Sequence, residues 1–210
     1  MIDFSRIMFF IALVPAVIVH EYCHGRAAEL MGDKTARLAG RLTFNPIPHI
    51  DLFGTIILPL ILVFSGSPIV FGWAKPVPIN PYNFKDPRKG MMYTGMAGPA
   101  SNFIMAAIAG FAVRLGLFSY IPSIEAFLIY FLIINIVLGV FNLIPIPPLD
   151  GSRVVSGILP YKLAREYNKL EQYGMIILMI IFLFFNERLW ATIGPVMSFL
   201  VYLLLGQHFI

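Results

Sequence analysis

An uncharged apolar run near the N-terminus leads directly into a cluster of ionisable residues. Residues 7–19 carry only apolar side chains and one proline, and His20, Glu21 and His24 follow at once. A helix needs about 20 apolar residues to cross a bilayer, so residues 5–30 are predicted to form a spanning helix. Ionisable side chains inside such a helix are costly and usually functional. The second half of this helix is therefore predicted to hold a polar functional site.

The ionisable residues follow the pattern H-E-x-x-H, from His20 to His24. Residues four apart share one face of a helix, so both imidazoles can reach one metal ion. Glu21 lies beside the first histidine, where a carboxylate can accept a proton from water at the metal. The alternative is a buried polar network that only fixes helix packing. Because placing three ionisable side chains inside a membrane costs free energy, a metal site is the favoured interpretation.

The composition of the chain is typical of a membrane protein. It is 59% hydrophobic and 12% charged, with a mean hydropathy of +0.82. These values predict an all-α polytopic membrane protein with about five to six transmembrane helices, forming a single domain over residues 1–210. The single cysteine excludes an internal disulfide and a cysteine-rich zinc site. The net charge of +4 is small and its cations lie in short loops, which indicates membrane topology and not nucleic-acid binding.

Apolar runs and their breaks predict the order of elements. After the first helix, residues 33–50 are expected to form short strands or an extended loop. The apolar run 52–66 is short and contains Pro59, and we expect it to re-enter the membrane without spanning it. The remaining predicted segments are helices at about 91–117 and 123–143, an amphipathic surface helix at 161–173, and apolar helices at about 174–185 and 189–205.

A catalytic zinc needs a third protein ligand besides the two histidines. The best candidate is Asp150, because Pro145, Pro147 and Pro148 precede it and forbid an ordinary helix. Non-helical backbone at membrane depth occurs only where it is buried in protein or lines a wet cavity. The alternative for Asp150 is a carboxylate that caps the following helix. His208, near the C-terminus, and the loop pair His49 and Asp51 are weaker candidates.

Two further motifs carry a resemblance to a known family. The run from Asn142 to Gly151 reads N-x-x-P-x-x-P-L-D-G, and the sequence Gly98-Pro-Ala-Ser-Asn102 lies in the middle helix. Together with H-E-x-x-H, these motifs resemble the site-2 protease family of intramembrane zinc metalloproteases over residues 5–155. The chain is similar to the compact prokaryotic branch, which lacks PDZ and CBS domains. Residues 161–206 would then be C-terminal helices outside this catalytic core.

The resemblance implies roles for individual residues. His20, His24 and Asp150 would hold one Zn²⁺ per chain, with Glu21 as general base. Asn142 would hold the substrate carbonyl or the substrate chain. We also expect auxiliary or substrate-binding roles for Asn102, His49 and Asp51. The alternatives are hydrogen bonding between helices for the two asparagines and turn ordering for His49 and Asp51.

Topology gives a further expectation. If His24 and Asp150 share one metal, an even number of crossings separates them, which the two middle helices supply when residues 52–66 do not span. Most of the lysines and arginines then lie on one side, which is the cytoplasmic side by the positive-inside rule. The site is therefore expected toward the cytoplasmic face of a prokaryotic cell membrane.

The predicted function is hydrolysis of peptide bonds in transmembrane segments by a zinc-dependent endopeptidase. Expected partners are single-span membrane protein substrates and the lipid bilayer, with no nucleic acid. An unwound substrate could pair with a strand edge in residues 33–50. The alternatives are a membrane metal transporter and a catalytically inactive relative that binds membrane proteins. The sequence gives no indication of oligomeric state.

Overall fold

Four long helices form the frame of the molecule. The computed structural model describes residues 4–65 and 72–206, and no strand occurs among them. The helices long and apolar enough to cross a membrane are α1 (Phe4–Leu30), α4 (Pro87–Arg114), α5 (Pro122–Asn142) and α9 (Asn186–Leu205). The all-α polytopic class is confirmed. The predicted count of five to six spanning helices is too high for the described residues.

Shorter helices connect these four. They are α2 (Thr35–Leu38), η1 (Ile47–His49), η2 (Leu52–Ile57), α3 (Leu58–Phe64), η3 (Pro81–Asn83), α6 (Asp150–Ile158), α7 (Tyr161–Asn168), η4 (Lys169–Tyr173) and α8 (Gly174–Phe184). Helix α8 has 11 residues, so it is about 16 Å long and too short to span the hydrocarbon core. The apolar helix predicted at about 174–185 is therefore present, but it is not a membrane span.

The alternative of strands in residues 33–50 is wrong. This stretch forms α2, η1 and turns, with no strand among its residues. Asp33 starts the first turn by accepting hydrogen bonds from the backbone N–H and the hydroxyl of Thr35. Pro46 and Pro48 have no N–H for a sheet ladder, which disfavours pairing with a neighbouring strand. The predicted strand edge for substrate is therefore absent from this stretch.

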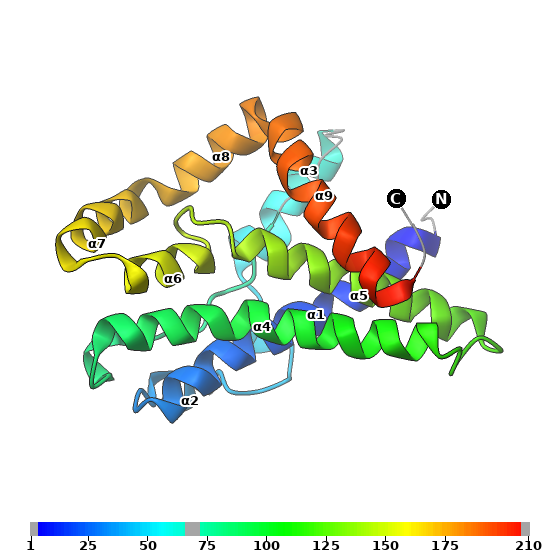
Figure 1. Ribbon diagram of the computed structural model, residues 1–210, viewed down its shortest axis with the longest axis horizontal. Helices are drawn as coiled ribbons and strands as arrows, with labels where there is room; N and C mark the ends of the chain where they lie inside the picture. Colours follow the sequence, from blue (N-terminus) through cyan, green and yellow to red (C-terminus); the bar gives the residue numbers. More distant parts are fainter. Residues whose placement is uncertain (1–3, 66–71, 207–210) are drawn as a thin grey trace.

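The core lies between α4, α5 and α9 and between α1 and α5. Helices α1, α4 and α5 pack against one another, and α9 lies across α4 and α5 (Figure 1). Buried side chains in the first interface include Ala106, Leu132, Ile136 and Val201. Small residues bring α1 and α5 together, because Ala12 and Ala16 are fully buried against Ile134.

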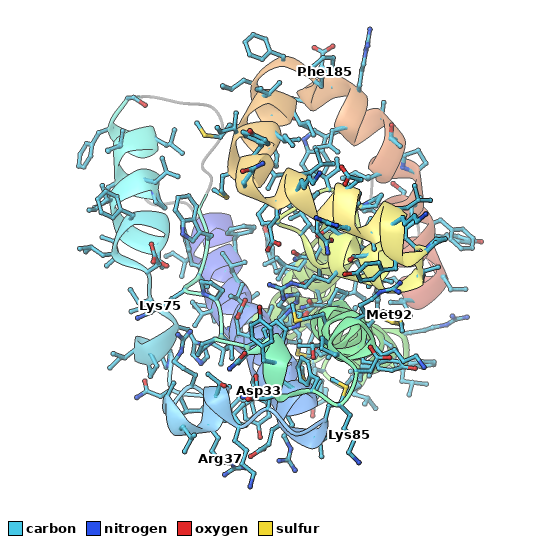
Figure 2. The ribbon with its side chains drawn as sticks, turned by 90° about the vertical axis from the view of Figure 1, so that its left-hand side faces the viewer. Asp33, Arg37, Lys75, Lys85, Met92 and Phe185 are labelled. Atoms are coloured by element: carbon cyan, nitrogen blue, oxygen red, sulfur yellow. The ribbon has the colours of Figure 1, made fainter. Side chains whose placement is uncertain are left out.

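The C-terminal end of α1 and the N-terminal end of α4 lie together. Asp33, just after α1, accepts hydrogen bonds from the backbone N–H of Asn80 and the side-chain amide of Asn83. A few residues later, Asp86 caps α4 by accepting the N–H groups of Arg88 and Lys89. Figure 2 looks onto this end of the molecule, where Asp33 lies near Lys85 and Arg37. The connection between the two helices thus begins and finishes at one end of the bundle.

Within this connection, residues 52–64 form an excursion, and residues 72–80 run back alongside its first residues. The N–H of Trp73 donates to the Gly54 carbonyl at 3.1 Å, and that of Lys75 donates to the His49 carbonyl at 2.9 Å. The intervening residues 66–71 lie outside the described part of the chain. Such a return is the behaviour expected of a segment that does not cross. Its re-entry into the membrane stays a prediction.

The break after α5 sets the position of α6. The segment 143–149 contains Pro145, Pro147 and Pro148, which prevent α5 from continuing. Helix α6 then begins at Asp150 and packs on α4. This turn brings Asp150 back toward the middle of the bundle.

Candidate metal centre

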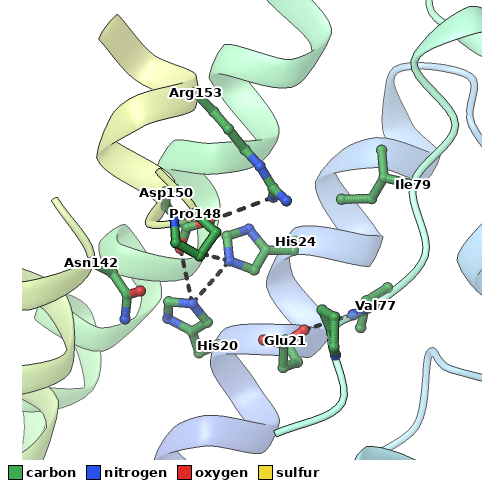
Figure 3. Close-up of a pocket in the computed structure, with 10 residues that line it drawn as sticks. His20, Glu21, His24, Val77, Ile79, Asn142, Pro148, Asp150 and Arg153 are labelled. Carbon is green, nitrogen blue, oxygen red and sulfur yellow. Dashed lines mark hydrogen bonds and ion pairs between the residues drawn. The ribbon is translucent and has the colours of Figure 1, made fainter. Parts of the chain in front are cut away.

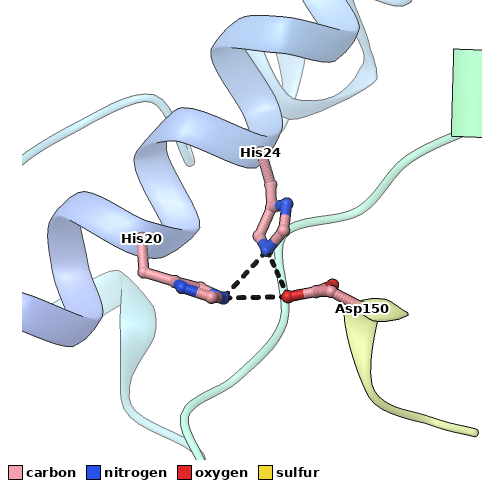
Figure 4. A group of neighbouring side chains, drawn as sticks. All are labelled: His20, His24 and Asp150. Carbon is pink, nitrogen blue, oxygen red and sulfur yellow. Dashed lines mark hydrogen bonds and ion pairs between the residues drawn. The ribbon is translucent and has the colours of Figure 1, made fainter. Parts of the chain in front are cut away.

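His20, His24 and Asp150 converge on one point between α1 and α6. Each histidine Nε2 lies close to Asp150 Oδ2, at 3.1 Å for His20 and 3.0 Å for His24, and the two Nε2 atoms are 2.9 Å apart (Figures 3 and 4). All three side chains are buried, with at most 7% of their surface exposed. Two residues one helical turn apart and a third 126 positions later thus form a single cluster.

The cluster fits a tetrahedral metal ion. Zinc binds imidazole nitrogen and carboxylate oxygen at about 2.0–2.2 Å, so two of its ligand atoms are about 3.3 Å apart. The three donor atoms here form a triangle with edges of 2.9–3.1 Å, close to that spacing. Among the described residues, these three side chains are the group that could hold a metal ion.

The outer nitrogens of both imidazoles point away from the cluster. Nδ1 of His24 lies 2.7 Å from the backbone carbonyl oxygen of Thr94, and Nδ1 of His20 lies 2.5 Å from Oδ1 of Asn102. Asn102 in turn donates to Asn135 Oδ1 at 2.7 Å. Such outer partners orient metal-binding imidazoles. The sequence pointed to Asn102 but gave no sign of Thr94 or Asn135, which need the packing of α4 and α5.

The close approach of α4 to the histidines requires a glycine. A Cβ atom at Gly98 would lie 2.3 Å from Nε2 of His24 and 2.6 Å from Cε1 of His20. Gly95, one turn earlier, allows the same close approach to α6, since its Cβ would lie 2.9 Å from that of Arg153. The glycines of α4 therefore allow both α1 and α6 to pack close to this helix, which brings their side chains together.

A polar cavity of about 120 Å³ opens beside the cluster. One water needs about 10–15 Å³ on such a measure, so several waters fit. The lining residues come from α1, the segment 72–80, the end of α5, the segment 143–149 and α6. They are His20, Glu21, His24, Pro76, Val77, Ile79, Asn142, Pro148, Asp150 and Arg153 (Figure 3).

Glu21 and Asn142 both line this cavity. One carboxylate oxygen of Glu21, Oε2, accepts the backbone N–H of Val77 at 2.8 Å, which holds the side chain against the segment 72–80. The amide of Asn142 donates to the carbonyl of Leu138, one turn back in α5, at 3.0 Å. An amide nitrogen has two N–H groups, so the second remains for another acceptor.

Arg153 also reaches the cavity, although the sequence did not point to it. Its Nη1 lies 3.5 Å from Oδ1 of Asp150, the oxygen that does not face the histidines. The available signal was its position three residues after Asp150 on a helix.

The remaining candidates lie elsewhere. Nε2 of His49 lies 3.0 Å from the carbonyl oxygen of Thr43, and Asp51 accepts the N–H of Gly54 at the start of η2. Neither is among the described residues that line the cavity. These contacts order the loop, in line with the alternative considered for them. His208 lies outside the described residues.

Comparisons with known proteins agree on one family. The model of peptidase family M50 matches residues 116–185. A Bacillus subtilis protein named "Putative zinc metalloprotease YwhC" is 38% identical over 179 residues, covering 82% of this chain and 78% of that protein. The Mycobacterium tuberculosis protein "Putative zinc metalloprotease Rip2" is 27% identical over 172 residues, covering 80% of this chain and 63% of that protein. No solved structure gives a significant match.

Proposed function

The chain belongs to peptidase family M50, a family of membrane zinc metalloproteases, and from that premise we propose that it is an active intramembrane endopeptidase. Its cofactor is zinc, and we assign His20, His24 and Asp150 as the ligands. The observation that carries the proposal is their convergence beside a polar cavity with room for several waters, with both histidines on α1, a helix long enough to cross a membrane. Buried polar groups in such a place require a function.

Zinc bound there would acidify water and polarise a carbonyl oxygen, which is the chemistry needed for peptide hydrolysis. Glu21 acts as the general base. Its Oε2 accepts the N–H of Val77, which makes that oxygen the less basic of the two and favours Oε1 as the one that takes a proton from water. The same carboxyl group then gives that proton to the nitrogen of the leaving amine.

Asn142 and Arg153 complete the wall of the cavity. The free N–H of the Asn142 amide donates to the oxygen of the scissile carbonyl as negative charge develops on it. Arg153 engages Oδ1 of Asp150 and leaves Oδ2 for the metal. The hydrogen bond from Val77 holds Glu21 in place between turnovers.

The substrates we propose are single-span membrane proteins, cut within their membrane segment near the cytoplasmic face of the cell membrane. Two features support this placement. The site lies in the C-terminal half of α1, and the end where α1 finishes carries basic residues, among them Arg37, Lys75 and Lys85 (Figure 2). By the positive-inside rule that end faces the cytoplasm.

The test uses the purified full chain and the variants Glu21→Gln and Asp150→Ala. The proposal predicts about one zinc per chain in wild type and Glu21→Gln, less in Asp150→Ala, and cleavage of single-span substrates by wild type alone. Zinc binding by wild type without cleavage of any of several single-span membrane proteins would favour a metal transporter or an inactive relative. Cleavage by Glu21→Gln at the wild-type rate would refute the assignment of the base.

A further inference from the structure

The two zinc-binding histidines are oriented by different kinds of partner. Nδ1 of His24 faces the backbone carbonyl of Thr94 at 2.7 Å. A carbonyl oxygen only accepts hydrogen bonds, so Nδ1 of His24 must carry the proton. Nε2 then presents its lone pair toward the cluster, which is the form that binds a metal. The backbone alone determines the tautomer of His24.

His20 has no such backbone partner. Its Nδ1 faces the side-chain amide of Asn102 at 2.5 Å. An amide has an oxygen that accepts and a nitrogen that donates, and a half-turn exchanges them. If the nitrogen faced His20, Nδ1 would have to accept and the proton would move to Nε2, which points at Asp150 and the metal position. Asn102 by itself therefore leaves the tautomer of His20 open.

Asn135 on α5 removes this ambiguity. Its Nδ2 donates to the backbone carbonyl of Phe131 at 2.8 Å, which directs its Oδ1 toward Asn102. That oxygen accepts Nδ2 of Asn102 at 2.7 Å, so Oδ1 of Asn102 must face His20. The hydrogen bonds run in one direction from His20 to the Phe131 carbonyl.

Because Asn102 and Asn135 are buried, their orientation depends on this chain of hydrogen bonds. Both amide side chains have 0% of their surface exposed, so no bulk water can replace a lost partner. The other acceptor near Nδ2 of Asn102 is the carbonyl of Ala16, at 3.4 Å. That distance is at the limit of a useful hydrogen bond, and this contact alone would hold the amide weakly.

We propose that Asn135 is a positioning residue of the zinc centre. It touches neither the ligand cluster nor the cavity lining described above, and acts by fixing the amide of Asn102 so that His20 carries its proton on Nδ1. The proposal rests on the metal site of the proposed function but not on cleavage. Loss of an outer partner typically lowers metal affinity by about 10–100-fold.

The test compares three variants of the full chain in detergent. Asn135→Leu removes the acceptor and is expected to lower zinc affinity by about 10–100-fold in a chelator competition. Asn135→Asp should stay close to wild type, because a buried carboxyl group favours its neutral form. In that form its carbonyl accepts from Asn102 and its hydroxyl donates to Phe131. Leu132→Ala is the control, since Leu132 is fully buried in α5 among the residues packed against α9.

A second readout reports the tautomer directly. Nitrogen NMR of the labelled histidines in the zinc-free protein should show a proton on Nδ1 of His20 in wild type and its partial loss in Asn135→Leu, with His24 unchanged; Nε2 of His20 faces the Asp150 carboxylate in both proteins and is not the reporter. Wild-type zinc affinity and an unchanged His20 tautomer in Asn135→Leu would overturn the proposal. So would an equal loss of zinc affinity in Leu132→Ala, which would indicate general destabilisation. Neither readout uses cleavage, so the results are independent of whether the protein cuts a substrate.

Discussion

Replacing Gly98 by alanine should remove zinc while leaving the helices folded. The new Cβ would lie 2.3 Å from Nε2 of His24, whereas ordinary contacts begin at 3.4 Å, so the nitrogen must retreat by about 1.1 Å. Metal-ligand distances tolerate changes of about 0.2 Å. The imidazole is also held by the carbonyl of Thr94, one turn earlier in α4, at 2.7 Å, so it cannot retreat from α4 without losing that hydrogen bond.

The expected loss of zinc affinity is at least about 100-fold, or about 2.8 kcal/mol at 1.4 kcal/mol for each tenfold change. The cost to folding is smaller. Overpacking costs about 1–3 kcal/mol, and alanine recovers about 0.5–1 kcal/mol relative to glycine inside a helix. Zinc affinity is measured by chelator competition, and folding by thermal unfolding of the zinc-free protein.

Gly194→Ala is the matched control. Gly194 lies inside α9 with no atom within 4 Å of the added Cβ. Its substitution should leave zinc affinity unchanged and raise the melting temperature slightly. Wild-type zinc affinity in Gly98→Ala would refute the placement of α4 against the histidines.

Three further predictions concern groups around the site. Burial by itself would raise the pKa of Asp33, but its hydrogen bonds hold that pKa below the ordinary value. The carboxylate therefore stabilises the fold above about pH 4 and loses this effect as the pH falls through its folded pKa. The melting temperature of Asp33→Asn should depend less on pH in this range than that of wild type. Identical pH profiles for the two proteins would contradict this role. Val77→Pro removes the N–H that Glu21 accepts and should lower kcat about tenfold or more at unchanged zinc content. Val77→Ala keeps the N–H and should cleave substrate at nearly the wild-type rate. Equal losses of kcat in both variants would exclude the hydrogen bond as the cause. Arg153→Gln should weaken zinc binding about tenfold by releasing Oδ1 of Asp150, and an unmoved chelator midpoint would show that the guanidinium has no such role.

The convergence of His20, His24 and Asp150 was predictable because each part has a local signature. His20 and His24 share a helix face by their spacing, and Asp150 follows a run of prolines that stops a membrane helix. The partners of these residues were not predictable. The Thr94 carbonyl, the Val77 N–H and the Asn135 amide depend on the register between helices or on the path of a loop.

The errors have a similar origin. Hydropathy detects apolar composition but not where a helix ends: the run 174–185 is apolar like a membrane span, although α8 has 11 residues and is too short to cross. Residues 33–50 lack helical periodicity, yet local hydrogen bonds from Asp33 and the restricted backbone at Pro46 produce turns and short helices there. Strand propensity without a partner strand was a weak guide.

The most direct test of the account is to locate the cleaved bond. Purified wild type and Glu21→Gln would be reconstituted in liposomes with a single-span substrate, and the products identified by mass spectrometry. The account predicts zinc-dependent cleavage by wild type alone, at a bond inside the apolar segment and nearer its cytoplasmic end. Cleavage only in the flanking polar regions, or cleavage that survives the loss of Glu21, would contradict it.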